Sequence, residues 1–328
     1  MRNIFFYMAA LVLLGSCSKN AKEKLSVTEE QASKAKLKQE SGIQQINFTQ
    51  QNLFPEGVVY DPFNNRFYVS SITTGDIGIV TPDGSYTAFI TDPALTATTG
   101  LEIDKAHKRL YVSNSAGAVG IYDINTGERF YWVDLAALLP GAPIFINDIA
   151  FDPQGNAYVT NSLSPVIYKI TPDGEASIFF QNAAFALAPG QFGFNGIEYS
   201  NRGYLLVSFT NNSQVVKIPV REPSAFSIVS LSAALNRPDG LLLSNNGKEL
   251  IVVNNAGGGN GMVQLFTSDD NWESGTLSSS FSAGSVFPTT ATTDGKNVYV
   301  LYAYLHQQAA GRAQFTIQEV PTDSRGNF

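Results

Sequence analysis

The sequence has very few of the residues that build most metal centres and nucleophile sites. It contains one cysteine, Cys17, and two histidines, His107 and His306, among 328 residues. A single cysteine excludes a disulfide within the chain. Zinc favours His and Cys ligands, and the two histidines fall in different repeat units. The Gly-x-Ser-x-Gly and His-Glu-x-x-His motifs are also missing, so a serine-hydrolase elbow and a zinc-protease helix are not expected.

Long apolar runs are scarce as well. One run of eleven residues, 4–14, follows Arg2 and is too short to span a bilayer comfortably, which is typical of a signal peptide. It leads into Leu-Gly-Ser-Cys at 14–17, which resembles a bacterial lipobox. The resemblance implies cleavage before Cys17 and a lipid on its thiol, and Ser18 in place of Asp implies the outer membrane.

The expected organisation follows from these signals. Residues 1–16 are predicted to be a lipoprotein signal peptide, 17–42 the lipidated cysteine and a solvated tether, and 43–328 one folded body. We expect an outer-membrane lipoprotein of the cell envelope, facing the periplasm or the cell surface. The lipid anchor is its only expected contact with the membrane.

An excess of positive charge is absent too. The chain has 21 basic and 28 acidic residues, and residues 1–40 hold seven and four of them, which leaves a net charge of −10 on the remainder. A phosphate-binding surface needs the opposite sign, so nucleic acid is not an expected partner. We expect a monomer that binds a small-molecule substrate.

Helical periodicity is nearly absent, and a repeat takes its place. Six segments align without gaps at their starts, 43 to 50 residues apart, and each is followed by a polar turn and a β-rich run. The segments are EGVVYDP from Glu56, TGLEIDK from Thr99, NDIAFDP from Asn147, NGIEYSN from Asn195, DGLLLSN from Asp239 and TTATTDG from Thr289.

The repeat predicts an all-β fold. A period in the forties with about four short antiparallel strands per unit indicates a six-bladed β-propeller. The last unit offers only three strands, and the segment 43–51 precedes the first unit as a spare strand. We expect this N-terminal strand to complete the sixth blade and close the ring, which removes the unpaired edges. A β-sandwich is the main competitor, but it does not explain six registered starts.

The first residues of the six segments form a ring at one mouth of the predicted channel. Four of them, Glu56, Asn147, Asn195 and Asp239, carry a carboxylate or an amide oxygen. Two carboxylates and two amides suit a hard cation with six to eight oxygen ligands, and Ca²⁺ fits best among the divalent cations. Asn-Gly and Asp-Gly are also common turn dipeptides. The shared register of the four residues is what favours the metal site over four separate turns.

The ordered motifs resemble the senescence marker protein/gluconolactonase (regucalcin-like) family, which is related to diisopropyl fluorophosphatase and the paraoxonases. The resemblance covers about residues 45–320 and rests on PEGVVYD, INDIAFDPQGNAYVTNS, FNGIEYS and RPDGLLLSNNGKELIVVN. It implies a catalytic Ca²⁺ held by Glu56, Asn147, Asn195 and Asp239, with Asp148 as an acidic residue beside the site. Where gluconolactonases often have an Arg that holds the sugar acid, this chain has Phe145, which indicates a more apolar pocket together with Phe192 and Phe194.

The leading hypothesis is a Ca²⁺-dependent hydrolase of a lactone or similar ester. Asp239 is the expected catalytic residue, as a general base or as a nucleophile, and Thr99 and Thr289 are expected to line the substrate site. One alternative is a lipid-anchored binding module whose Ca²⁺ is structural, and another is a lyase or synthase on the same scaffold. An open metal site favours catalysis, whereas a capped one favours the binding module.

Overall fold

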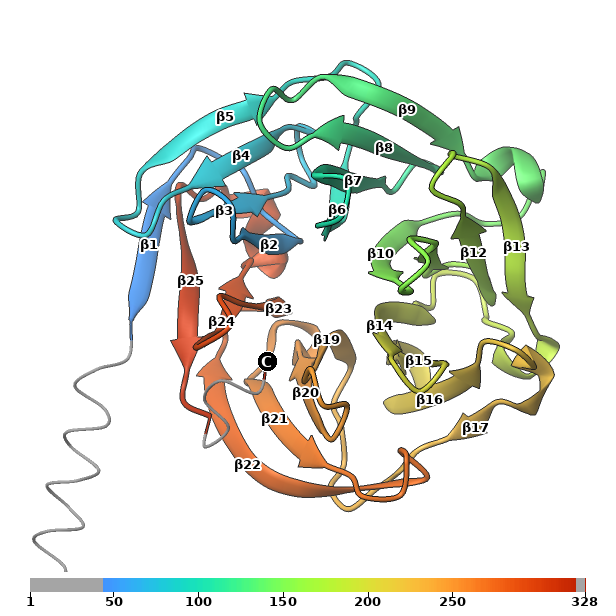
Figure 1. The fold of residues 1–328 in the computed structure, drawn as a ribbon. Coiled ribbons are helices and arrows are strands. Elements are labelled where there is room, and N and C mark those ends of the chain that lie inside the picture. The colour runs from blue at the N-terminus through green and yellow to red at the C-terminus, as the bar shows by residue number, and fades with distance from the viewer. Residues whose placement is uncertain (1–43, 323–327) are drawn as a thin grey trace, which may run out of the picture. The chain divides into compact units, whose positions relative to one another are not determined.

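The computed structural model describes residues 44–322 and residue 328. These residues form a ring of six β-sheets around a central channel, which confirms the predicted propeller (Figure 1). The predicted signal peptide, the lipidation of Cys17 and the tether lie outside the described residues. In the described part of the chain, no helix is long and apolar enough to cross a membrane.

Each blade consists of antiparallel strands that run in sequence order from the channel outward, except at the ring closure. The strands are, blade by blade, β2 (Val58–Asp61), β3 (Arg66–Val69), β4 (Ile77–Val80) and β5 (Tyr86–Ile90); β6 (Thr98–Asp104), β7 (Arg109–Asn114), β8 (Ala118–Asp123) and β9 (Arg129–Asp134); β10 (Ile146–Phe151), β11 (Ala157–Asn161), β12 (Val166–Ile170) and β13 (Ala176–Gln181); β14 (Phe194–Ser200), β15 (Tyr204–Phe209), β16 (Gln214–Pro219) and β17 (Ser227–Ile228); β19 (Pro238–Leu243), β20 (Glu249–Asn254), β21 (Gly261–Thr267) and β22 (Ser274–Gly284); β23 (Pro288–Thr293), β24 (Val298–Tyr302), β25 (Gln314–Val320) and β1 (Gln45–Thr49).

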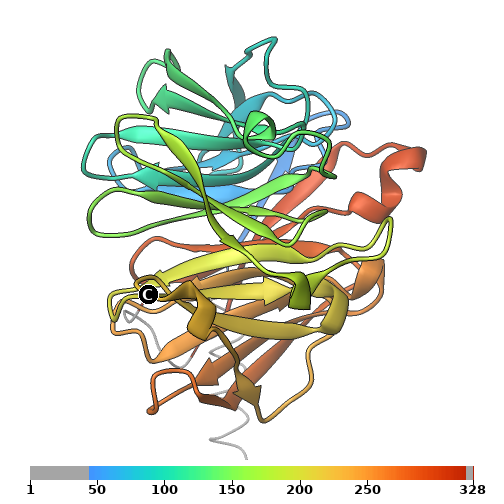
Figure 2. The same ribbon diagram turned by 90° about the vertical axis from the view of Figure 1, so that its right-hand side faces the viewer.

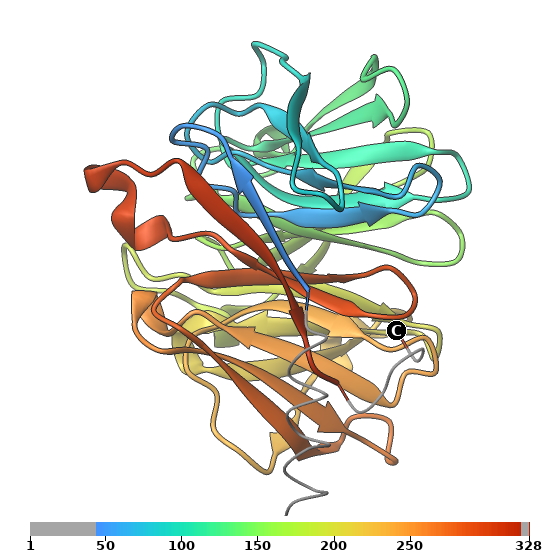
Figure 3. The same ribbon diagram turned by 90° about the vertical axis from the view of Figure 1, so that its left-hand side faces the viewer.

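The helical content of the described residues is limited to short 3₁₀ turns in the connections. They are η1 (Ala136–Leu138), η2 (Ala183–Phe185), η3 (Thr210–Asn212), η4 (Pro223–Ala225), η5 (Ala256–Gly258) and η6 (Leu305–Ala310). Figures 2 and 3 show the ring edge-on, with the blades stacked side by side. The turns η5 and η6 lie in connections at the end of the channel where the innermost strands begin, and Phe328 lines the channel toward the opposite end.

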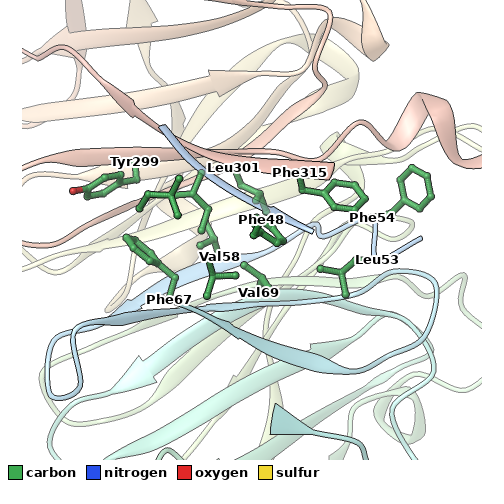
Figure 4. Packing of buried hydrophobic residues seen from close by; sticks show 12 residues of the cluster. Phe48, Leu53, Phe54, Val58, Phe67, Val69, Tyr299, Leu301 and Phe315 are labelled. Carbon is green, nitrogen blue, oxygen red and sulfur yellow. The ribbon is translucent and has the colours of Figure 1, made fainter. Parts of the chain in front are cut away.

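The N-terminal strand closes the ring as expected. Strand β1 pairs antiparallel with β25 along its whole length, so the sixth sheet has the order β1-β25-β24-β23. Phe48 of β1 is 1% exposed and packs against the ring of Phe315, with ring centroids 6.0 Å apart (Figure 4). Joining the two ends of the chain in one sheet buries an edge that would otherwise be open to another strand.

The hydrophobic core is divided among the junctions between blades. Each of the six buried apolar clusters joins residues of two neighbouring blades. Strand β7 shows why: Tyr111 faces the junction with the third blade, and Leu110 and Val112 face the junction with the first. A strand whose two faces are both buried must be apolar along its length, which explains the runs such as RLYV and NAYVT in the sequence.

One strand was not anticipated from the sequence. Strand β18 (Ser230–Leu231) pairs in parallel with the outer strand β22 and makes the fifth sheet five-stranded. A two-residue strand carries no periodic signal, so it can be recognised only once β22 lies beside it.

Candidate functional site

The six ring residues meet at one end of the channel, and all six are buried. A cavity of about 10 Å³ lies among them, close to the space that one water molecule or ion needs. It is lined by the side chains expected to bind metal and by two of the predicted neighbours: Glu56, Asn147, Asn195, Asp239, Asp148 and Thr289. The structure therefore brings together, around one point, residues up to 233 positions apart in the sequence.

Thr99 is the ring residue that does not line this cavity. Its hydroxyl donates to the backbone oxygens of Ile146 (2.9 Å) and Asn147 (3.1 Å) in the next blade. Thr99 thus joins the second and third blades and contacts the backbone of Asn147, and its contact with substrate stays a prediction.

Backbone bulges direct the ring side chains inward. In five of the six innermost strands, the pairing with the second strand is interrupted at the ring residue and the one after it, for example between Ile146 and Ile149 and between Phe194 and Ile197. A bulge frees two residues from the ladder and re-aims their side chains, and bulges are common next to active sites.

The glycines after the ring residues serve close packing rather than turns. A Cβ at Gly196 would lie 2.4 Å from the backbone oxygen of Asp239, and one at Gly57 would lie 2.3 Å from that of Thr99. Neighbouring innermost strands approach so closely here that only glycine fits. The Asn-Gly and Asp-Gly pairs of the ring therefore have a different physical origin from turn dipeptides.

Polar side chains directly after the second strands orient the ring. Asn147 Nδ2 donates to Ser162 Oγ (2.9 Å) and to Asn195 Oδ1 (2.7 Å), and Asn255 Nδ2 donates to Asp239 Oδ2 (2.7 Å). Because the amide hydrogens of Asn147 are used in this way, its Oδ1 is left available as a ligand atom.

The sequence analysis missed these supporting residues, although a signal exists. Serine, threonine or asparagine follows each of the first five ring residues after 15 or 16 positions, and three of these residues hydrogen-bond a ring side chain: Ser162, Thr210 and Asn255. Thr210 accepts from Asn195 Nδ2 (3.4 Å) and donates to the backbone oxygen of Pro238 (2.7 Å), so it also joins two blades.

The site is acidic and contains no basic lining residue. Burial, followed by the charges of Asp239 and Asp148, raises the pKa of Glu56 well above its usual value. Burial raises the pKa of Asp239 to about 7, against hydrogen bonds from Asn255 and Asn195 that lower it. Burial also raises the pKa of Asp148 to about 7. Ionising these buried, neighbouring carboxyls is unfavourable, so they stay protonated. A cation among them would offset this unfavourable energy and lower their pKa values.

A buried hydroxyl without a partner lies at the same place. Thr289 is 1% exposed, lines the cavity, and its Oγ1 has no hydrogen-bond partner among the described residues. Buried polar atoms are nearly always satisfied, so an unpaired one indicates a missing water or ion. The described residues contain no group of three or more His, Cys, Asp and Glu that could hold a metal. A metal here would instead depend on two carboxylates with amide and hydroxyl oxygens.

The aromatic residues near the site divide into two groups. Phe145 and Phe192 are half-buried and pack edge to face, with ring centroids 5.2 Å apart. Phe194 is fully buried in the junction of the third and fourth blades, so it cannot line an apolar pocket.

Neither histidine faces the cavity. His107 lies in a turn, with Nδ1 2.6 Å from Asp104 Oδ2. His306 is exposed in η6 and stacks on Phe287.

A larger cavity of about 560 Å³ fills the rest of the channel. Asp148 lines both cavities, and Glu102 and Glu198 line the larger one. Burial raises the pKa of both glutamates. Each lies three residues after a ring residue, a regularity that the sequence analysis did not use.

The family follows from a match to the sequence. The model of the SMP-30/gluconolactonase/LRE-like region matches residues 54–273, which is more than half of the chain and contains five of the six ring residues. The chain belongs to this family. No curated relative matches the chain.

Solved structures of similar fold include three with high coverage. The Malassezia sympodialis allergen Mala s 1 is 21% identical, with 87% of this chain and 97% of that chain covered and a TM-score of 0.67. A luciferin-regenerating enzyme is 13% identical, with 86% and 97% covered and a TM-score of 0.64. Regucalcin from Agrobacterium tumefaciens, described as a calcium-binding protein, is 15% identical, with 85% and 95% covered and a TM-score of 0.58. At these identities the similarity shows the shared propeller fold.

Proposed function

We propose that the protein is a Ca²⁺-dependent hydrolase that opens a lactone or a similar ester. The observation that carries the proposal is the convergence of two carboxylates and two amides on one ion-sized cavity without a basic residue. Membership of a family that includes gluconolactonases supports the lactone, and the calcium-binding description of regucalcin supports the metal.

Four residues of the chain would hold the ion: Glu56, Asn147, Asn195 and Asp239. Asp148 lines the same cavity and accepts a hydrogen bond from the N–H of Ile197 (3.2 Å). When bound, the cation polarises the substrate carbonyl and stabilises the negative charge that develops on its oxygen. The overall reaction adds one water: its oxygen bonds to the carbonyl carbon, the ring C–O bond breaks, and the released alkoxide takes a proton to give a hydroxy acid.

Asp239 is the residue we assign to the chemistry. The hydrogen bonds from Asn255 to Oδ2 and from Asn195 fix the carboxylate, which would take a proton from the attacking water or act as the nucleophile. Asp239 reaches this place because Pro238 starts an innermost strand, whereas Asp83 and Asp173 of the same Pro-Asp-Gly triplet lie in hairpins that join β4 to β5 and β12 to β13.

The test combines calcium binding with turnover. Chelator-treated protein should bind Ca²⁺ in titration calorimetry, and hydrolysis of a panel of lactones should disappear with chelator and return with Ca²⁺. Asp239→Asn should remove hydrolysis while the propeller stays folded by circular dichroism. Asp173→Asn is the matched control, because Asp173 lies in an exposed second copy of the Pro-Asp-Gly sequence, and this variant should retain activity. Full activity of Asp239→Asn would refute the assignment.

A second candidate is a binding module with a structural ion. The observation that favours it is the burial of the ligands, since Asn147 and Asp239 are only 3% and 4% exposed and the cavity holds no more than an ion or a water. Calcium binding without hydrolysis of any lactone or ester would support this candidate against the first.

A further inference from the structure

The mouth of the channel above the ring is poor in charge. It is built by the connections that lead into the innermost strands and by those that join the second and third strands of each blade. Apart from Glu56, the acidic, basic and histidine residues of these described connections are Asp76, Asp92, Arg237, His306 and Arg312. A charged group of a ligand that enters here therefore meets very few partners.

Arg237 differs from Asp92 and Arg312, two other charged residues of these connections. Asp92 pairs with Arg129 at 2.7 Å. Arg312 lies 3.4 Å from the ring centroid of Tyr304 and donates to Gln307 Oε1 (2.9 Å). The guanidinium of Arg237 is exposed and makes no side-chain hydrogen bond or ion pair with any described residue.

The backbone holds Arg237 in an unusual conformation two residues before Asp239. Its φ is 53°, in the left-handed region that residues with a Cβ seldom adopt. Its N–H donates to Ser213 Oγ (3.2 Å), and its carbonyl accepts from the N–H of Asn255 (3.2 Å). The corresponding residues of the first and sixth blades, Phe54 (φ 44°) and Phe287 (φ 51°), share this conformation, so it is a recurring feature of the blades and not special to Arg237.

The side chain of Arg237 packs against η5. A Cβ at Gly257 would be 3.4 Å from Arg237 Cδ and 3.5 Å from Nε, so the guanidinium stem packs directly over this glycine. The positive charge is close enough to Asp239 to oppose part of the rise in pKa that burial causes at that carboxyl.

The corresponding residues of the other five blades are uncharged. Two positions before each ring residue lie, in chain order, Phe54, Ala97, Phe145, Gly193 and Phe287. Arg237 is therefore the one cation in an otherwise apolar set, in a body with a net charge of −10.

We propose that Arg237 binds a carboxylate of the substrate, so that the site selects lactones or esters that carry a negative charge beside the scissile group. The inference rests on the proposed function. A guanidinium can bind a carboxylate through two parallel hydrogen bonds, and the scarcity of competing charges leaves it available. The edge-to-face pair of Phe145 and Phe192 provides apolar contacts for the remainder of the same substrate.

The experiment uses a matched pair of lactones. One carries a free side-chain carboxylate, and the other has that carboxylate converted to a neutral methyl amide. Arg237→Gln should lower kcat/KM for the anionic lactone about ten- to hundredfold, mainly through KM, and leave the amide unchanged. Arg237→Lys should fall in between. Arg312→Gln, whose guanidinium is already engaged, is the control and should not change the ratio between the two lactones.

A binding measurement separates this inference from the proposed function. Titration calorimetry follows binding of the hydroxy acids made by opening the two lactones, in wild type and in Arg237→Gln. If Arg237→Gln loses affinity only for the hydroxy acid with the side-chain carboxylate, the inference is supported, even if no lactone is hydrolysed. The absence of hydrolysis would refute only the proposed function. Hydrolysis of both lactones at equal rates, unchanged in Arg237→Gln, would overturn the inference and leave the proposed function standing.

Discussion

Replacement of Asp239 by Asn should stabilise the metal-free protein at neutral pH. This is the opposite of what removal of a buried, hydrogen-bonded residue usually does. Asp239 is 4% exposed, and Glu56 and Asp148 are its acidic neighbours. Asn can still accept the hydrogen bond from Asn255, but it carries no charge.

The expected size follows from the pKa of Asp239. Burial raises this pKa from 3.8 to about 7, so the folded state binds more protons than the unfolded state between these values. The free energy of unfolding therefore falls as the pH rises from about 4 to about 7, by at most about 4 kcal/mol at 1.36 kcal/mol per pKa unit. The variant lacks this loss, so its advantage should be near zero at pH 4 and about 2 to 4 kcal/mol at pH 8.

The assay is urea unfolding in chelator between pH 4 and pH 8, followed by the same series with Ca²⁺. The free energy of unfolding of wild type should rise by about 2.7 kcal/mol at a Ca²⁺ concentration of 100 times Kd, and that of Asp239→Asn should rise little. The difference between the two proteins should therefore shrink or change sign. Asp173→Asn, an exposed turn residue, should stay within about 0.5 kcal/mol of wild type throughout. A variant less stable than wild type at pH 8 in chelator would refute the electrostatic account of the site.

Three further outcomes are expected. Gly196→Ala should weaken Ca²⁺ binding and lower stability, because its Cβ would lie 2.4 Å from a backbone oxygen, whereas Gly259→Ala, with no atom closer than 3.2 Å, should be mild; equal calcium titrations of the two would contradict the close-packing argument. Phe48→Ala should lower the free energy of unfolding by about 3 to 5 kcal/mol in urea, and a loss under about 1 kcal/mol would show that β1 is not needed for closure. Thr289→Val should leave stability in chelator unchanged or higher, since the hydroxyl has no partner, and weaken Ca²⁺ binding about fivefold; an unchanged Kd would remove Thr289 from the site.

The overall architecture could be predicted because a propeller repeats one pattern. The six aligned segment starts predicted the six innermost strands. The missing strand of the last unit, together with the spare segment 43–51, predicted the closure of the ring by β1. The parallel strand β18 could not be predicted, since its partner β22 lies more than forty residues away and its two residues show no alternation.

The residues of the candidate site could be predicted from the sequence, but the contacts of their side chains could not. The register placed Glu56, Asn147, Asn195 and Asp239 level with one another, and the cavity that they line agrees with this. Thr99 shares the register, yet its hydroxyl is taken by carbonyls of the next blade. The same alignment could not distinguish these two outcomes, because they depend on how closely neighbouring blades approach.

The three Pro-Asp-Gly triplets show how far the sequence alone predicts the structure. Their place in the repeat already separates Asp239, at a strand start, from Asp83 and Asp173, between the third and fourth strands. What the sequence by itself determined is therefore the strand order, the ring closure and the set of residues at the channel mouth, because these follow from periodicity along the chain.

The tertiary structure alone decided the rest. It isolated Asp239 from solvent beside Glu56 and Asp148 and packed Gly196 against a neighbouring backbone. It also left the guanidinium of Arg237 without a hydrogen-bond or ion-pair partner among the described residues. Burial, like-charge proximity and close approach are properties of groups that come from different blades. Their energies depend on distances across the ring, which no local pattern in one segment contains.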